Sequence, residues 1–235
     1  MAGGKRIRPV LAICVLLVAA VAAYYGREIF TARQYTLDTV LPQEKAARYP
    51  LQLSSLSQRQ LEILLKVEDP HFFEHRGIDF STPGAGITTI TQGLVKHLYF
   101  DRFKPGIAKL RQTLIARFAL DPLMSKRMQL TRFINTVYLG PGAKGFEQAA
   151  QVYFHLPFSQ LSEDQYIALV AMIIAPATFS VETSPQRNRQ RCERIKLVVS
   201  GQYQPKGLCD LFYGKLDSET QKHLPPLSYF ASYYR

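Results

Sequence analysis

The stretch EDPHFFEHRGID, residues 68–79, gathers four acidic residues and two histidines around Gly77. Apolar residues at helical spacing precede it, and Ser57 followed by Gln60 predicts a capping box that begins their helix. Glu68 therefore falls at the end of an apolar helix, where partial removal from water raises a carboxyl pKa and makes the carboxylate a better proton acceptor. The alternative is that these acids cap helices and pair with surface arginines.

A second stretch, GAGITTITQ at residues 84–92, is followed closely by Lys96. Small residues and hydroxyl groups let backbone and short donors approach a ligand, and a lysine can bind phosphate. The alternative is an ordinary loop before a helix. Residues 87–91 are all β-branched, which by propensity favours a strand, so the local structure stays open between strand and helix.

Further helices are predicted along the rest of the chain. Residues 107–118 carry apolar side chains at helical spacing with cations between them. Ser125 is expected to cap a helix that stops at the Gly-Pro-Gly of residues 140–142, and Ser162 begins another capping box. Residues 166–175, apolar nearly all round, are predicted to lie in the core. The sequence therefore predicts a mostly α-helical domain.

The amino terminus and the overall charge limit the possible partners. The chain is 47% hydrophobic, which excludes global disorder, and its formal net charge of +11 favours an anionic partner. Cations at residues 5–8 precede an apolar run at residues 10–25, which predicts a membrane-spanning signal anchor with its amino end in the cytoplasm. A cleaved signal peptide is the alternative, because residues 19–23 are small, whereas Tyr24 and Tyr25 favour an uncleaved anchor.

Taken in order, the clusters resemble family 51 glycosyltransferases, the polymerase domain of class A penicillin-binding proteins and of monofunctional peptidoglycan polymerases. The first family motif, E-D-x-x-F-x-x-H-x-G-x-D, is matched at every named position by Glu68, Asp69, Phe72, His75, Gly77 and Asp79. The second motif is matched by Gly86, Thr89, Ile90, Thr91 and Gln92, with departures at Ile87, Thr88 and Gly93. The fourth is matched by Asn135, Tyr138, Gly140, Gly142, Ala143, Gly145 and Glu147, and the fifth by Ala175, Pro176, Pro185 and Arg191.

The resemblance implies a lysozyme-like helical domain with an amphiphilic region facing the membrane. It implies that Glu68 deprotonates the 4-hydroxyl of the acceptor sugar, whose oxygen attacks the donor's anomeric carbon while a lipid pyrophosphate leaves with inversion. Substrate binding falls, on the same resemblance, to Asp69, His75, Thr89, Thr91, Gln92, Lys96, Lys109, Arg111 and Glu147. The implied substrate is a lipid-linked disaccharide pyrophosphate, and other cell-wall synthesis proteins are possible partners.

The third family motif, R-K-x-x-E, is where the sequence departs most. Alignment puts Ala108 at its arginine and Gln112 at its glutamate, the second acid of the family's active site. Glutamine keeps the size but carries no charge, so it cannot hold a cation such as Mg²⁺ or Mn²⁺ as a carboxylate does. Two alternatives stay open: a divalent cation that assists the reaction, and a non-catalytic member that binds the lipid precursor or organises other cell-wall enzymes.

The first cluster also contains a motif of a different enzyme class. His71, Glu74 and His75 spell H-x-x-E-H, a zinc-peptidase signature, and Pro70 could begin the helix that would align the two histidines. That hypothesis leaves the second and fourth motifs unexplained. Neither S-x-x-K nor K-T-G occurs, so a monofunctional polymerase without a transpeptidase is expected.

The predicted organisation follows from these assignments. Residues 1–27 form the cytoplasmic tip and transmembrane anchor, 28–56 a stalk, 57–200 the glycosyltransferase domain and 201–235 a carboxy-terminal extension without a recognisable motif. The domain is expected on the outer face of the bacterial cytoplasmic membrane, where nucleic acid is not an expected partner.

Overall fold

The structure, a computed structural model, describes residues 4–104 and 106–225, with side chains from residue 10. Eleven α-helices form in the described part of the chain: α1 (Gly4–Tyr35), α2 (Leu41–Ala46), α3 (Gln58–Glu68), α4 (Ile90–Tyr99), α5 (Ile107–Ile115), α6 (Asp121–Leu123), α7 (Lys126–Thr136), α8 (Phe146–Phe154), α9 (Glu163–Met172), α10 (Pro185–Val199) and α11 (Ser218–Lys222). No strand occurs in these ranges. The predicted mostly helical fold is confirmed.

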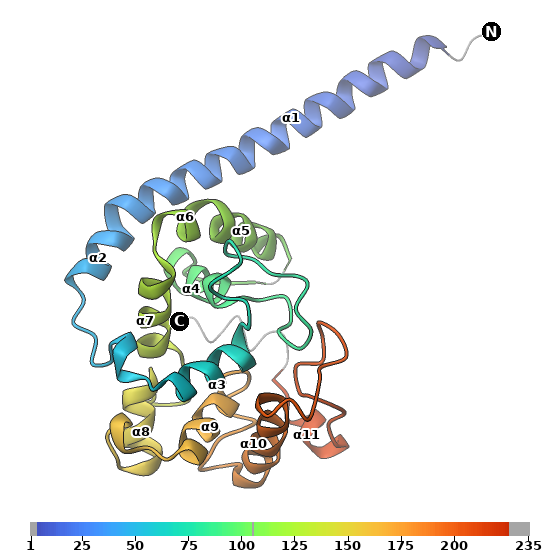
Figure 1. The fold of residues 1–235 in the computed structure, drawn as a ribbon. Helices are drawn as coiled ribbons and strands as arrows, with labels where there is room; N and C mark the ends of the chain where they lie inside the picture. The colour runs from blue at the N-terminus through green and yellow to red at the C-terminus, as the bar shows by residue number, and fades with distance from the viewer. Residues whose placement is uncertain (1–3, 105, 226–235) are drawn as a thin grey trace.

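The amino-terminal helix extends far from the body of the molecule (Figure 1). Helical structure is nearly continuous from α1 through a π-helical turn, Thr36–Val40, into α2. Val10–Ala46 is long and apolar enough to cross a membrane, and its most apolar window is 0% buried. An exposed apolar helix of this length fits a membrane anchor, in agreement with the predicted apolar helix at the amino terminus.

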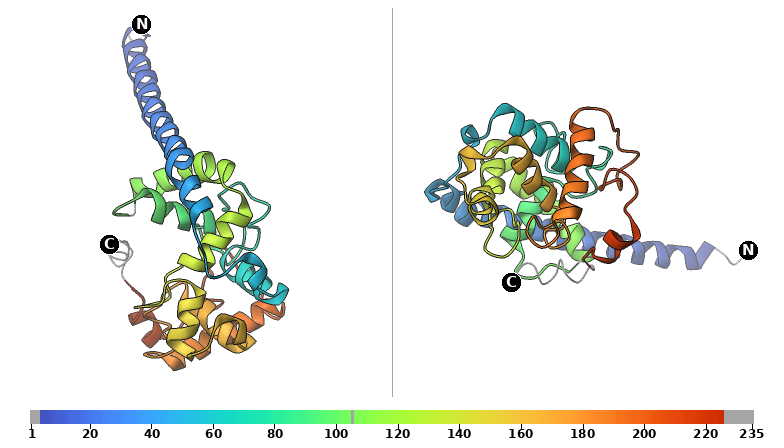
Figure 2. Two further views of the ribbon diagram at one scale, coloured as in Figure 1. Left: turned by 90° about the vertical axis from the view of Figure 1, so that its left-hand side faces the viewer. Right: turned by 90° about the horizontal axis from the view of Figure 1, so that it is seen from below.

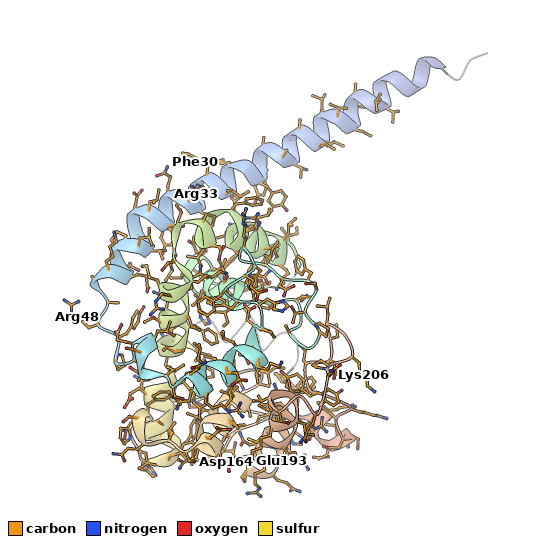
Figure 3. The ribbon with its side chains drawn as sticks, in the orientation of Figure 1. Phe30, Arg33, Arg48, Asp164, Glu193 and Lys206 are labelled. Atoms are coloured by element: carbon orange, nitrogen blue, oxygen red, sulfur yellow. The ribbon has the colours of Figure 1, made fainter. Side chains whose placement is uncertain are left out.

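The end of this helical segment lies against the body. Figure 3 shows Phe30 and Arg33 where α1 reaches the folded domain, and Arg33 donates to the Phe118 carbonyl at 2.7 Å. Thr36 Oγ1 lies 2.6 Å from the Tyr99 hydroxyl. Residues 28–56, predicted as a stalk, are therefore helical as far as Ala46 and packed on the domain near α4 and α5.

Helix α9 forms the centre of the lower half of the molecule (Figures 1 and 2). Tyr166 is fully buried, with its ring stacked on Phe146 at a centroid distance of 5.4 Å and edge-on to Phe158 at 5.9 Å. Helix α10 packs along it, and Lys196 pairs with Asp164 of α9 at 3.0 Å on the outer surface, beside Glu193 (Figure 3). The prediction that residues 166–175 lie in the core is confirmed for α9.

The structure confirms the predicted helix starts, which were predictable from sequence because each depends on hydrogen bonds between neighbouring residues. Ser57 and Ser162 form complete capping boxes with Gln60 and Gln165, and the Ser125 hydroxyl accepts from Met128 N. The β-branched stretch 87–91 forms no strand, since Thr89 caps α4 in a third capping box.

The turn between α7 and α8 generates a test of the packing. Gly145 and Gly142 both adopt positive φ, +79° and +70°, but a Cβ at Gly145 would lie 2.5 Å from the Asn135 carbonyl oxygen whereas one at Gly142 would meet nothing. We expect Gly145→Ala to lower the free energy of unfolding by about 2 kcal/mol or more, and Gly142→Ala by only about 1 kcal/mol of backbone strain.

Denaturant unfolding of the full chain in detergent measures both variants. Equal losses of unfolding free energy in the two variants would mean that the Asn135 backbone shifts to make room for the new Cβ and does not fix the turn.

Candidate active site

Glu68 is the last residue of α3, and it is only partly exposed. Removal from water raises its pKa to about 7, the positive charge of Arg191 lowers it, and the neighbouring Asp69 raises it. The Tyr166 hydroxyl also interacts with Glu68 electrostatically, and it has no hydrogen-bond partner among the described residues. A carboxylate with a pKa close to neutrality is suited to accept a proton from an alcohol during a reaction.

Asp69 joins this helix end to the start of α4. It is 2% exposed, and its Oδ1 lies 2.8 Å from His75 Nε2 while its Oδ2 accepts from the Ile90 backbone N–H at 3.0 Å. A carboxylate at a helix N-terminus satisfies a free N–H and interacts favourably with the helix dipole. The first and second sequence clusters therefore meet through one buried carboxylate.

Thr89 and Gln92 add two further connections. The Thr89 hydroxyl donates to the Gly77 carbonyl at 2.8 Å and accepts from Gln92 N at 3.1 Å. Gln92 is fully buried, and its Nε2 donates to Thr113 Oγ1 on α5 at 2.9 Å. These side chains bond to protein atoms, so they hold the turn around Gly77 and α5 against the beginning of α4.

Gln112, at the position of the family's second glutamate, is also buried. It is 1% exposed, and its Nε2 donates to the Gln92 carbonyl at 2.6 Å. Its Oε1 has no hydrogen-bond partner within the described residues. A carboxylate here could not donate to that carbonyl, so the amide has a structural role for which glutamate is no substitute.

Two predicted site residues lie in separate contacts. Thr91 is fully buried and donates to Gln129 Oε1 on α7 at 2.7 Å. Glu147 lies in the first turn of α8, where its Oε2 accepts from the Phe158 N–H at 3.3 Å. The structure does not join either of them to the hydrogen bonds around Asp69, and substrate contact through them stays a prediction.

Two partly exposed lysines form a cationic region beside this network. Desolvation lowers the pKa of Lys96 to about 8, with a further contribution from the charge of Lys109, and desolvation lowers the pKa of Lys109 to about 8 as well. Lys109 Nζ donates to Thr88 Oγ1 at 2.7 Å, and Lys96 Nζ lies 4.8 Å from the centroid of the Phe103 ring. A bound anion would restore both pKa values, so this region favours a negatively charged ligand.

Arg111 has a partner that the sequence did not reveal. Its guanidinium forms an ion pair with Glu28 of α1 at 2.5 Å and lies 5.4 Å from the Phe100 ring centroid. Helix α1 therefore fixes the orientation of a cation that the resemblance assigns to substrate binding.

The zinc-peptidase hypothesis lacks the local structure it requires. Residues 70–74 form turns and no helix, and the two histidines have different partners: His71 Nδ1 lies 3.0 Å from Thr82 Oγ1, and His75 bonds to Asp69. No group of three or more His, Cys, Asp or Glu side chains in the described ranges could hold a metal ion. A divalent cation that assists the reaction stays a prediction.

Comparison with known proteins places this geometry in a family. The family model described as Transglycosylase matches residues 81–199, half of the chain. The chain belongs to the transglycosylase family. The predicted family resemblance is thereby confirmed, and the first cluster, residues 68–79, directly precedes the matched region.

The relatives of this chain have consistent names. Penicillin-binding protein 1A of Haemophilus influenzae is 29% identical over 200 residues, which cover 77% of this chain and 23% of the relative. Penicillin-binding protein 1F of Bacillus subtilis is 28% identical over 168 residues, 66% of this chain and 23% of the relative. The biosynthetic peptidoglycan transglycosylase of Nitrosomonas eutropha is 29% identical over 170 residues, 66% of this chain and 69% of the relative. The chain thus spans about a quarter of the length of the penicillin-binding relatives.

Three residues of the site were not predicted as such. Arg191 was noted only as a match to the fifth motif, although it is 3% exposed and its charge acts on Glu68. Nothing in the sequence indicated that Glu28 and Tyr166 belong to the site. Glu28 contacts Arg111 and Tyr166 interacts with Glu68, and both interactions join segments far apart in the sequence.

The raised pKa of Glu68 predicts a stability difference that depends on pH. Below about pH 4.5 the carboxyl is neutral in both the folded and the unfolded protein. Between 4.5 and the folded value of about 7, only the unfolded state ionises, so stability falls as pH rises. Glu68→Gln lacks this penalty, and we expect its stability advantage to grow over this window to on the order of 1–3 kcal/mol and then stay constant.

Unfolding free energies of the two proteins at a series of pH values measure this difference. Glu62→Gln is the matched control, since Glu62 lies on the same helix with 55% of its side chain exposed. A Glu68→Gln advantage that is independent of pH would contradict the desolvation of Glu68.

Proposed function

We propose that this protein is a peptidoglycan glycosyltransferase. It polymerises a lipid-linked disaccharide pyrophosphate into β-1,4-linked glycan strands on the outer face of the bacterial cytoplasmic membrane, to which α1 anchors it. The observation that carries the proposal is the partly desolvated carboxylate of Glu68 in a chain whose family match covers residues 81–199. The names of the relatives from Nitrosomonas eutropha and Haemophilus influenzae support the same substrate class.

In the proposed reaction Glu68 accepts the proton of the acceptor sugar's 4-hydroxyl. The oxygen attacks the anomeric carbon of the donor from the face opposite the pyrophosphate, so the configuration inverts as the carbon–oxygen bond to the lipid pyrophosphate breaks. With a pKa of about 7, Glu68 is substantially ionised at neutral pH, yet basic enough to take the proton as the bond forms.

Negative charge that develops on the leaving pyrophosphate requires cations fixed in advance. Lys96 and Lys109 supply them in this proposal, because both side chains are partly desolvated and would gain from a bound anion. Arg111 supplies a third, held in place by Glu28. Asp69 acts by fixing the end of α3 against the start of α4, and Thr89 and Gln92 act by holding the turn around Gly77 and α5 against the same helix start.

The direct test is polymerisation by the detergent-solubilised full chain of labelled lipid-linked disaccharide-pentapeptide, with products separated on a gel. We expect a ladder of glycan chains from the native protein and a loss of rate of about 10²- to 10⁴-fold in Glu68→Gln, which removes the base without changing its size. Glu62→Gln, on the same helix, should polymerise like the native protein. Full activity in Glu68→Gln would refute the assignment of the base.

A second candidate function rests on Gln112. A family member without the second acid could bind the lipid precursor and organise other enzymes without catalysis. Folded native protein that binds the precursor but makes no ladder, together with strong activity of Gln112→Glu, would establish that alternative. Our proposal instead requires an active native protein, and a Gln112→Glu variant that is less stable because it loses the bond to the Gln92 carbonyl.

A further inference from the structure

The segment that follows α10 lies outside the residues matched by the family model, yet it returns to the first two sequence clusters. In Figures 1 and 2 this part of the chain, after residue 200, runs beside the loop that precedes α4. Figure 3 places Lys206 at the outer edge of the molecule, on the far side of that segment from α3. We call residues 201–216 the return segment.

The return segment fixes the loop before α4 through its backbone. Gly84 N–H donates to the Gly207 carbonyl and Gly86 N–H to the Leu208 carbonyl, both at 2.9 Å. A Cβ at Gly84 would lie 2.7 Å from Pro205, so the two chains approach closely at a position where φ is +78°. A glycine at this position permits both the contact and the backbone conformation.

The same segment contacts the end of α3. Tyr213 is 4% exposed, and its hydroxyl donates to the Val67 carbonyl at 3.2 Å. Val67 immediately precedes Glu68. Tyr213 adopts a φ of +55°, a conformation that a tyrosine holds only where its surroundings fix it.

The return segment also builds most of the environment of Arg191. The guanidinium donates to the carbonyls of Ala171 and Leu211, each at 3.1 Å. It lies 5.6 Å from the ring centroids of both Phe212 and Tyr213, and 5.3 Å from that of Phe179. One of the two carbonyls and two of the three aromatic rings therefore come from residues 211–213. In the described ranges no carboxylate forms an ion pair with Arg191 within 4.0 Å.

We propose that the return segment is part of the catalytic apparatus: through Tyr213 and Arg191 it positions Glu68 and sets the charge that the Glu68 carboxylate faces. Tyr213 and Arg191 are positioning residues, which act on Glu68 and do not touch substrate. This inference rests on the proposed function only in that Glu68 is the base. The placement of Glu68 by the return segment is a property of the folded protein and can be measured without catalysis.

The direction of the expected effect follows from the groups that face Glu68. Burial and the charge of Asp69 raise the pKa of Glu68, and Arg191 of α10 lowers it. The hydroxyls of Tyr166 on α9 and Tyr213 are uncharged at neutral pH, as phenols ordinarily are, and burial raises their pKa values further. Arg191 is thus the one cation in this set. A variant that releases Arg191 from its place raises the pKa of Glu68 further and leaves less carboxylate at pH 7.

Tyr213→Leu is the principal test, because it removes both the bond to Val67 and one ring from Arg191. Tyr213→Phe keeps the ring and removes only the bond, and Arg191→Gln removes the charge. Tyr153→Leu is the matched control: Tyr153 on α8 likewise donates its hydroxyl to a backbone carbonyl, that of Leu139 at 2.8 Å.

The measurement is the unfolding free energy of each full-length protein in detergent, with and without Glu68→Gln, between pH 4 and pH 9. The pH above which the difference stops growing gives the pKa of Glu68 in the folded protein of each background. We expect about 7 in the native background, a value about one unit higher in Tyr213→Leu, the largest rise in Arg191→Gln and no change in Tyr153→Leu. An unchanged plateau pH in folded Tyr213→Leu, or in Tyr213→Phe and Arg191→Gln if Tyr213→Leu does not fold, would overturn the proposal.

The polymerisation rate gives a second readout. In Tyr213→Leu the acidic limb of the pH–rate profile should move up by the same amount, with kcat reduced several-fold at pH 7, restored at higher pH, and KM unchanged. A native protein that makes no glycan would refute the proposed function but leave the stability measurement intact, so the two failures are distinguishable.

Discussion

The arrangement of the site depends on one buried carboxylate, that of Asp69. Its two oxygens bond to His75 and to the first backbone N–H of α4, and almost none of its surface reaches water. A buried carboxylate without such partners would cost several kcal/mol, so the bonds restrict how α3 and α4 can meet. Glu68, one residue earlier, lies at the end of α3 and does not share the partners of Asp69. Burial there raises the pKa of Glu68 to about 7. Two adjacent acids thus have opposite roles: one is fully satisfied and holds the fold, and the other is left available for a proton.

The structure gives a physical reason for the departure from the family pattern at Gln112. Gln112 takes the position of a family glutamate, but its amide is buried and bonded to the backbone of Gln92. Cationic character next to it comes from Lys96, Lys109 and Arg111, and the last of these is oriented by Glu28. The helix that is long and apolar enough to cross a membrane therefore also orders a side chain that our proposal assigns to pyrophosphate binding.

The sequence predicted those features that depend on neighbouring residues. The capping boxes at Ser57 and Ser162 were predictable because both partners lie three positions apart, and the apolar pattern of α9 reports its burial directly. The stretch 87–91 was ambiguous, since β-branched propensity and the Thr89 cap favour different structures, and the cap prevailed. Contacts between distant segments carried no such signal. Tyr213 and Val67 are separated by 146 positions, and nothing in either residue type indicates that they meet. The catalytic assignment of Glu68 came from the family resemblance and stays a prediction, whereas its desolvation is a property of the fold.

The most direct test of this account is an infrared titration of Glu68 in the full-length protein, as a difference between native and Glu68→Gln spectra. The band of a protonated carboxyl group should disappear with a midpoint near pH 7, because the site withholds water from this side chain. A midpoint near the ordinary glutamate value of 4.5 would show that Glu68 is solvated like a surface residue, and would contradict both its desolvation and its proposed suitability as the base.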